Sequence, residues 1–161
     1  MEYIKVTKDN LQNEHICCAI SNNNDVQVSS KKPFLADPKY LKYKGFEVCD
    51  EADNGIQLWY LPFSAYAVKP SFKECAKHPH TDIPGYVLYY THQCPFNANY
   101  VPIVEQTAKD HGVPFRAILL SNKEEAQNAP TPITTYALFC DGKYLTNEQM
   151  NDTKFLKLLS L

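Results

Sequence analysis

The chain has 161 residues and a formal net charge of −2, with Lys and Arg scattered along it rather than clustered. This length fits one domain or two small ones, and the absence of a basic cluster argues against a nucleic-acid partner. No apolar run approaches the ~20 residues of a membrane span, and the start "MEYIKVTKDN" lacks the apolar core of a signal peptide. We therefore expect a cytoplasmic protein with no membrane partner, whose six cysteines are mostly reduced thiols.

The first part of the chain predicts a small α+β unit. Strands are expected at residues 2–7 and 26–30, and a helix at 31–46 that ends at Gly45. Two further strands, 46–52 and 56–63, flank the turn "DNG" and are expected to pair in antiparallel fashion. Between the first two strands, a period of 3.6 residues predicts a helix with one face formed by Leu11, His15, Cys18 and Ala19.

Residues 62–84 carry four prolines and little periodicity, so we take 64–84 as the best candidate for a linker. Beyond it, the pattern predicts alternating strands and helices in the order βαβαββα, which is the thioredoxin arrangement. The fold class is therefore α/β, with α+β character in the first part. The expected elements are strands at 86–91, 114–120, 133–140 and 143–146, and helices at 97–111, 121–129 and 151–161.

Cys94 stands where the first of these strands meets the first helix, in "THQCPFNANY". A helix N-terminus favours an anion, so we expect this position to favour the thiolate, and Pro95 suits the first helical position. His92 could add positive charge beside the sulfur or face away. Asn97 occupies the place of the second cysteine in a C-x-x-C pair, which disfavours disulfide exchange by two cysteines and leaves a monothiol or non-redox role.

A thioredoxin-like site also places a cis-proline opposite its cysteine, before the third strand. "APTPITTYALF" offers Pro130 and Pro132, of which Pro132 lies closer to the strand. We predict catalytic roles for Cys94 and His92 and substrate-binding roles for Pro132, Thr131 and Asn97. The alternative is that Cys94 is a small apolar residue at a turn, in a domain used only for binding.

Several stretches resemble the YoaP-type family, in which a GNAT N-acetyltransferase domain precedes a YoaP-like domain of the thioredoxin fold. In the first half the resemblance is carried by "EHICCAIS" and "SSKKPFLADPKYLKYKGFEV", and in the second by "VLYYTHQCPF", "YVPIVEQTAKDHGVPFRAI" and "NAPTPITTYALFCDGKYLTNE". The resemblance implies acetyl transfer from acetyl-CoA to an amine. It divides the chain into a shortened GNAT-like segment at 1–63, the linker at 64–84 and a YoaP-like domain at 85–161.

The sequence departs from this family in the acetyl-CoA site. A GNAT domain holds the pyrophosphate on a Q/R-x-x-G-x-G/A loop at a helix N-terminus, where glycines allow close approach. None of the five glycines lies in such a pattern. We therefore expect weak acetyl-CoA binding or none, and no other cofactor. The shortened segment would either pack on the second domain or expose a sheet edge and form a homodimer.

Two groups of soft ligands could in principle supply a metal site: His15, Cys17 and Cys18, and then "CAKHPH" at 75–80. Neither has paired C-x-x-C spacing, so we predict no metal. Two functions remain from different classes, an acetyltransferase homologue and a monothiol module that binds a small molecule or a thiol-containing partner. A chain without activity is a third possibility that the sequence leaves open.

Overall fold

The computed structural model describes residues 15–21 and 38–160, which mix helices and strands in an α/β fold with two sheets. The predicted strands at 2–7 and 26–30 lie outside the described residues. None of the described helices has the length and apolar character to cross a bilayer. In chain order, the elements are β1 (His15–Ser21), α2 (Pro38–Tyr43), β2 (Glu47–Glu51), β3 (Ile56–Pro62), α3 (Glu74–Lys77), β4 (Tyr86–Tyr90), α4 (Asn97–Asp110), β5 (Phe115–Leu119), α5 (Lys123–Gln127), β6 (Tyr136–Cys140), β7 (Lys143–Thr146) and α6 (Asp152–Leu159).

The first sheet has three antiparallel strands in the order β1-β3-β2. Its β2–β3 hairpin confirms the pair predicted around "DNG", with Gly55 at φ 78° in the turn. The helix predicted at 31–46 is described from Pro38, which suits a first helical position because it needs no N–H partner. Gly45 follows that helix at φ 86°, so the predicted C-terminal glycine is confirmed.

The helix predicted through His15, Cys18 and Ala19 is wrong in the described part, because residues 15–21 form strand β1. Every residue of β1 pairs with β3, from His15 opposite Pro62 to Ser21 opposite Ile56. Ile16, Cys18 and Ile20 alternate along β1 and pack on the same small core cluster. Pairing with a distant apolar strand therefore overrode a local pattern that also fitted a helix.

The second sheet has four strands in the order β5-β4-β6-β7, and its elements follow the predicted order βαβαββα. β4 and β5 are parallel, whereas β6 is antiparallel to β4 and β7 is antiparallel to β6. The predicted turn at "DG" is confirmed: Asp141 and Gly142 both have positive φ, 46° and 85°. This is the conformation that a two-residue hairpin loop requires.

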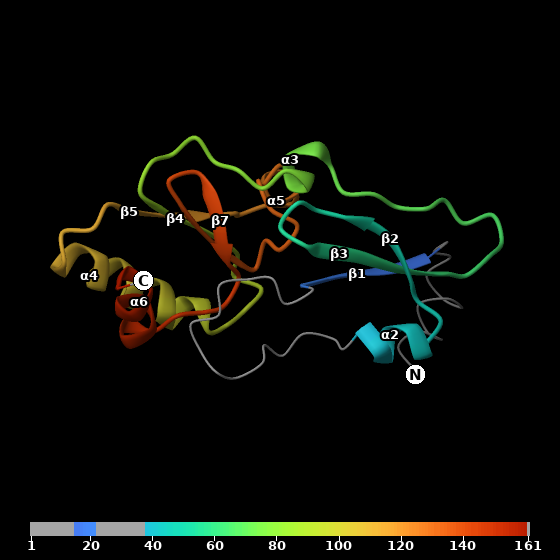
Figure 1. Ribbon diagram of the computed structural model, residues 1–161, viewed down its shortest axis with the longest axis horizontal. Coiled ribbons are helices and arrows are strands. Elements are labelled where there is room, and N and C mark those ends of the chain that lie inside the picture. Colours follow the sequence, from blue (N-terminus) through green and yellow to red (C-terminus); the bar gives the residue numbers. More distant parts are fainter. Residues whose placement is uncertain (1–14, 22–37, 161) are drawn as a thin grey trace.

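Helices α4 and α6 lie together on one side of the four-stranded sheet (Figure 1). Their apolar faces meet Leu88 and Leu138 of the central strands in the largest core cluster, which contains fully buried Val104 and Phe155. The helix predicted at 151–161 is confirmed as α6, and the side chain of Asn151 caps it by accepting from the N–H of Lys154 at 2.9 Å.

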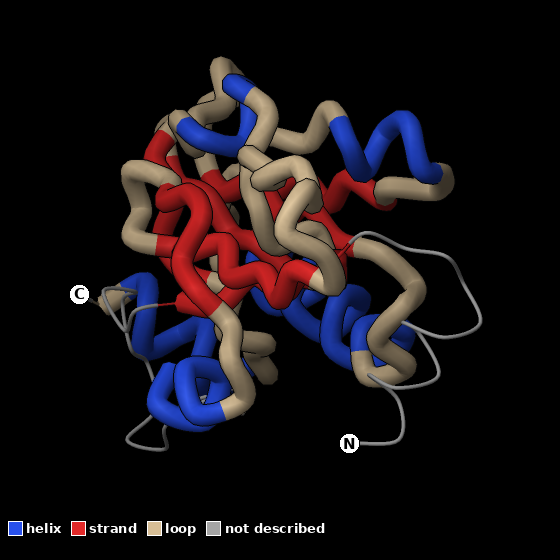
Figure 2. The backbone as a smooth tube through the Cα atoms, turned by 90° about the vertical axis from the view of Figure 1, so that its right-hand side faces the viewer, coloured by secondary structure: helices blue, strands red, loops and turns tan. Residues whose placement is uncertain are grey.

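The segment predicted as a linker contains α3 and contacts both sheets, reaching the second through a β-bridge between His80 and Lys143 of β7. Lys77 pairs with Asp50 of β2 at 3.0 Å, and Asp50 also accepts from the N–H of Phe72 at 2.9 Å. Lys73 donates to Asn128, just after α5, at 3.3 Å. Figure 1 accordingly shows α3 beside α5, and Figure 2 shows helices on both sides of the strands. The domain boundaries at 63 and 85 stay predictions.

Candidate functional site

Cys94 lies in the connection between β4 and α4, as the sequence predicted. Its side chain is partly buried and its carbonyl accepts from the N–H of Asn97 at 3.1 Å. The helix begins at Asn97 with Phe96 as N-cap, so Pro95 precedes the first helical position that we predicted for it. Phe96 is nevertheless already helical in φ and ψ, and this residue is 59% exposed.

Gln149 holds the Cys94 side chain from a distant part of the chain. It lies between β7 and α6, and its Nε2 donates to Cys94 Sγ at 3.2 Å and to the Oδ1 of Asn97. Because 55 residues separate Gln149 from Cys94, no local pattern could have revealed this contact. An amide that donates to the sulfur gives the thiolate a hydrogen bond that it can accept.

Asn97 is fully buried, and its amide joins two strands. Its Nδ2 donates to the carbonyl of Thr91, after β4, at 2.8 Å and to the carbonyl of Thr135, before β6, at 2.7 Å. The residue that replaces the second cysteine therefore uses all its amide hydrogens inside the protein. A substrate would meet Asn97 only after these bonds were broken, and the predicted substrate-binding role remains a prediction.

Thr131 and Pro132 lie in the segment just before β6, where the sequence predicted the site proline to be. Thr131 is 1% exposed, and its hydroxyl accepts from the N–H of Ile133 at 3.3 Å. Pro132 is partly exposed. No peptide bond among the described residues is cis, so Pro130 and Pro132 are both trans here. The site thus differs from the thioredoxin-like pattern in its proline isomer as well as at Asn97.

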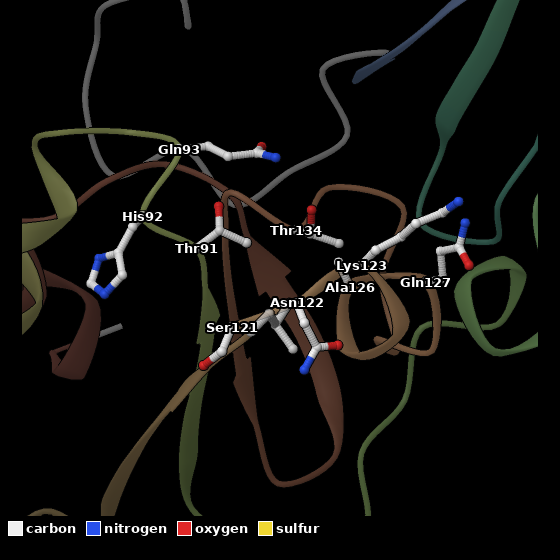
Figure 3. A pocket seen from close by; sticks show the side chains of 10 residues that line it. Thr91, His92, Gln93, Ser121, Asn122, Lys123, Ala126, Gln127 and Thr134 are labelled. Atoms are coloured by element: carbon white, nitrogen blue, oxygen red, sulfur yellow. The ribbon is translucent and has the colours of Figure 1, made fainter.

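A hollow of about 720 Å³ lies next to the three residues that precede Cys94. It is at the carboxyl ends of the parallel strands β4 and β5. Open α/β sheets commonly bind ligands at this end. Thr91 and His92 line it after β4, and Ser121 and Lys123 line it after β5. Figure 3 shows His92 at one end of the hollow and Lys123 at the other. The His92 ring packs edge-on to Tyr90, with centroids 6.1 Å apart.

Four of the other cysteines lie in surroundings that disfavour the thiolate. Burial is the main cause that raises the pKa of the thiols of Cys17, Cys18, Cys49 and Cys140. A raised pKa lowers the fraction of thiolate at neutral pH. All the described cysteines are free thiols.

Comparison with known proteins identifies the family. The model of the family described as YoaP-like matches residues 114–157. Over 143 residues, which are 89% of this chain, the sequence is 36% identical to a Bacillus subtilis (strain 168) protein named "Uncharacterized N-acetyltransferase YoaP". This chain is a YoaP-type family member. The alignment spans 57% of that relative's length, and no solved structure matches the chain.

The glycines of this YoaP-type chain do not form a pyrophosphate-binding loop in the described part. All five have positive φ and stand at turns or after helices: Gly45 follows α2, Gly55 joins β2 to β3, Gly85 precedes β4, Gly112 follows α4 and Gly142 joins β6 to β7. None directly precedes a described helix. The caps of α5 and α6, Asn122 and Asn151, accept from their own helices. No described glycine therefore stands before a helix, where the pyrophosphate-binding loop of a GNAT domain would need it.

The candidate metal ligands of this family member lie on different elements and form no common site among the described residues. His15, Cys17 and Cys18 lie on β1, whereas Cys75 and His78 lie at α3. Within residues 15–21 and 38–160, no group of three or more His, Cys, Asp or Glu side chains is arranged to hold a metal ion. His78 instead contacts Asp53 at 2.7 Å.

Proposed function

We propose that this chain is an N-acetyltransferase homologue of the YoaP type, in the class that transfers acetyl from acetyl-CoA to an amine. The observation that carries the proposal is 36% identity, over 89% of the chain, to a relative named as an N-acetyltransferase. The relative is longer than the aligned region, so the share of its activity that resides in this chain is part of the proposal.

Acetyl-CoA binding by this chain is proposed to be weak. The reason is the missing glycine loop, since the described glycines serve turns and helix ends rather than a helix N-terminus that could hold a pyrophosphate. Calorimetric titration of the full chain with acetyl-CoA tests this, with the Bacillus relative as the matched control. We expect a Kd weaker than about 100 µM for this chain. Micromolar affinity would contradict the proposal.

A second function is favoured by the hydrogen bond from Gln149 to the sulfur of Cys94. In this function, residues 85–161 form a thioredoxin-like monothiol module. The Cys94 thiolate attacks a disulfide of a small molecule or protein partner, so a mixed disulfide forms and the partner's other sulfur leaves as a thiolate. Asn97 cannot resolve that bond, so an external thiol releases the partner. His92 tunes the thiol, and Pro132 and Thr131 shape the partner's groove.

Treatment with 2-hydroxyethyl disulfide, followed by peptide mapping, tests the thiol function. Exposed Cys75 of α3 is the internal control, because it reports the reactivity of an accessible thiol in the same molecule. We expect Cys94 to form the mixed disulfide about ten-fold faster than Cys75. Gln149→Leu should remove most of that difference, whereas Gln106→Leu on exposed α4 should not. Equal rates at Cys94 and Cys75 in the unaltered chain would exclude the function.

A further inference from the structure

The described side chains that line the hollow at the ends of β4 and β5 include a positive charge and no negative charge. Among the described residues, Lys123 is the only full cation that lines it, and none of the described Asp or Glu side chains contributes to it. His92 adds a group that can become positive, while Gln93, Ser121 and Thr134 add neutral polar groups. A surface with a cation and no acid favours an anionic ligand over a cationic one.

Lys123 is available to a ligand. It is exposed and forms no ion pair with any residue in the described ranges. Gln127 lies four residues later on α5, so both side chains project from one helix face, as Figure 3 shows at the same end of the hollow. The nearby carboxylate of Glu125 is already used, since it accepts from the N–H of Ser121 at 2.6 Å.

Thr91 gives a second observation at the same place. This residue lines the hollow and is 5% exposed, yet its Oγ1 has no hydrogen-bond partner among the described residues. Buried hydroxyl groups in native proteins nearly always have a partner. Because this oxygen is itself buried, a ligand in the hollow would reach it only after the Thr91 side chain rotates, and Lys123 is the group that a ligand meets directly.

We propose that this hollow binds a small organic molecule that carries a carboxylate, with Lys123 as its counter-charge. The volume of about 720 Å³ suits an organic molecule rather than a simple ion, because small-molecule sites commonly have about 300–1,000 Å³. A protonated amine would instead meet Lys123 with no acid to balance its charge. The inference goes beyond the proposed function, since it requires neither acetyl transfer nor a reactive Cys94.

Calorimetry of the full chain with acetate, succinate and citrate tests the proposal. Succinamide serves as the neutral analogue of succinate, and 1,4-diaminobutane as a cationic probe of similar length. We expect saturable binding of at least one carboxylate, weakened about ten-fold by Lys123→Gln. Lys109→Gln is the matched control, because it removes the same charge from an exposed position on α4, and it should leave the affinity unchanged.

Three results would overturn the proposal. These are tighter binding of diaminobutane than of any carboxylate, equal weakening by Lys123→Gln and Lys109→Gln, and no saturable heat from any of the three carboxylates. Circular dichroism of both variants shows whether each is folded. The measurements involve neither acetyl-CoA nor disulfides, so a failure here is separate from a failure of the proposed function.

Discussion

The two sheets differ in how completely the described residues cover them. The four-stranded sheet packs α4 and α6 on one face, and a second cluster with Val87 and Phe139 fills the other. The three-stranded sheet has one small described cluster around Trp59, completed by the six-residue α2. The thiol site lies on the more fully packed sheet. Cys94 and the hollow are therefore supported by a well-packed scaffold, on which side-chain positions can be held accurately.

Replacing one buried leucine by alanine in the core cluster of each sheet gives the largest expected change in the free energy of unfolding. Leu138 is 0% exposed in the larger cluster and Leu41 is 6% exposed in the smaller one. We expect Leu138→Ala to lower the free energy of unfolding by about 4 kcal/mol and Leu41→Ala by about 2 kcal/mol, because the smaller cluster can relax around the cavity. Urea unfolding measures both. Equal losses would remove the proposed difference between the sheets.

Among the polar side chains that contact the larger sheet, we expect substitution of Asn97 to lower the free energy of unfolding most. Asn97→Ala leaves the carbonyls of Thr91 and Thr135 without their amide donor, so the free energy of unfolding should fall by about 3 kcal/mol. Exposed Asn99, on the same helix, provides the control, and Asn99→Ala should change it by less than about 0.5 kcal/mol. Similar urea midpoints for the two variants would show that the buried amide does not join β4 to β6 as described.

The contact between the three-stranded sheet and the segment before β4 should contribute less to the free energy of unfolding than Asn97 does. Asp50→Ala removes the acceptor of the Phe72 N–H and the partner of Lys77, and we expect a loss of about 1 kcal/mol. Amide hydrogen exchange reports the contact directly, because the Phe72 N–H should exchange faster. Glu105→Ala, on the exposed face of α4, is the matched removal of one acid and should leave that exchange rate unchanged.

The smallest effect is expected from the pH dependence of the same contact. The hydrogen bond from Asp53, together with its charge, raises the pKa of His78 above its ordinary value of 6.5. The stabilisation is therefore complete below pH 6.5 and is lost as the pH rises through the raised value. Because His78 is 60% exposed, the change should be small. Across this range the urea midpoint should depend less on pH in His78→Gln and in Asp53→Asn than in the unaltered chain. The reduction should be smaller in Asp53→Asn, because Glu74 still lies 3.6 Å from His78. An unchanged pH dependence in either variant would contradict the pairing.

Much of the larger sheet could be predicted from local patterns. The apolar run at 86–91, the glycine-containing turn after Cys140 and the helix capped at Asn151 each carry their own signal within a few residues. The position of Cys94 between a strand and a helix followed from the same patterns. β1 could not be assigned in this way, because His15–Ser21 fits a helical period locally and becomes a strand by pairing with β3. Its alternation of Ile16, Cys18 and Ile20 was the available signal.

The sequence by itself determined the α/β class, the order of elements after residue 85, the YoaP-type resemblance and the single cysteine at the strand-to-helix connection. The fold class, the order of elements and the position of the cysteine depend on neighbouring residues, so composition and periodicity express them, whereas the resemblance rests on the similar stretches themselves. Only the tertiary structure decided what surrounds that cysteine. It buries Asn97 between two strands, brings Gln149 to the Cys94 sulfur and places Lys123 in a hollow whose described lining contains no acid. These contacts join residues far apart in the chain, and their geometry arises only when the sheet and helices pack.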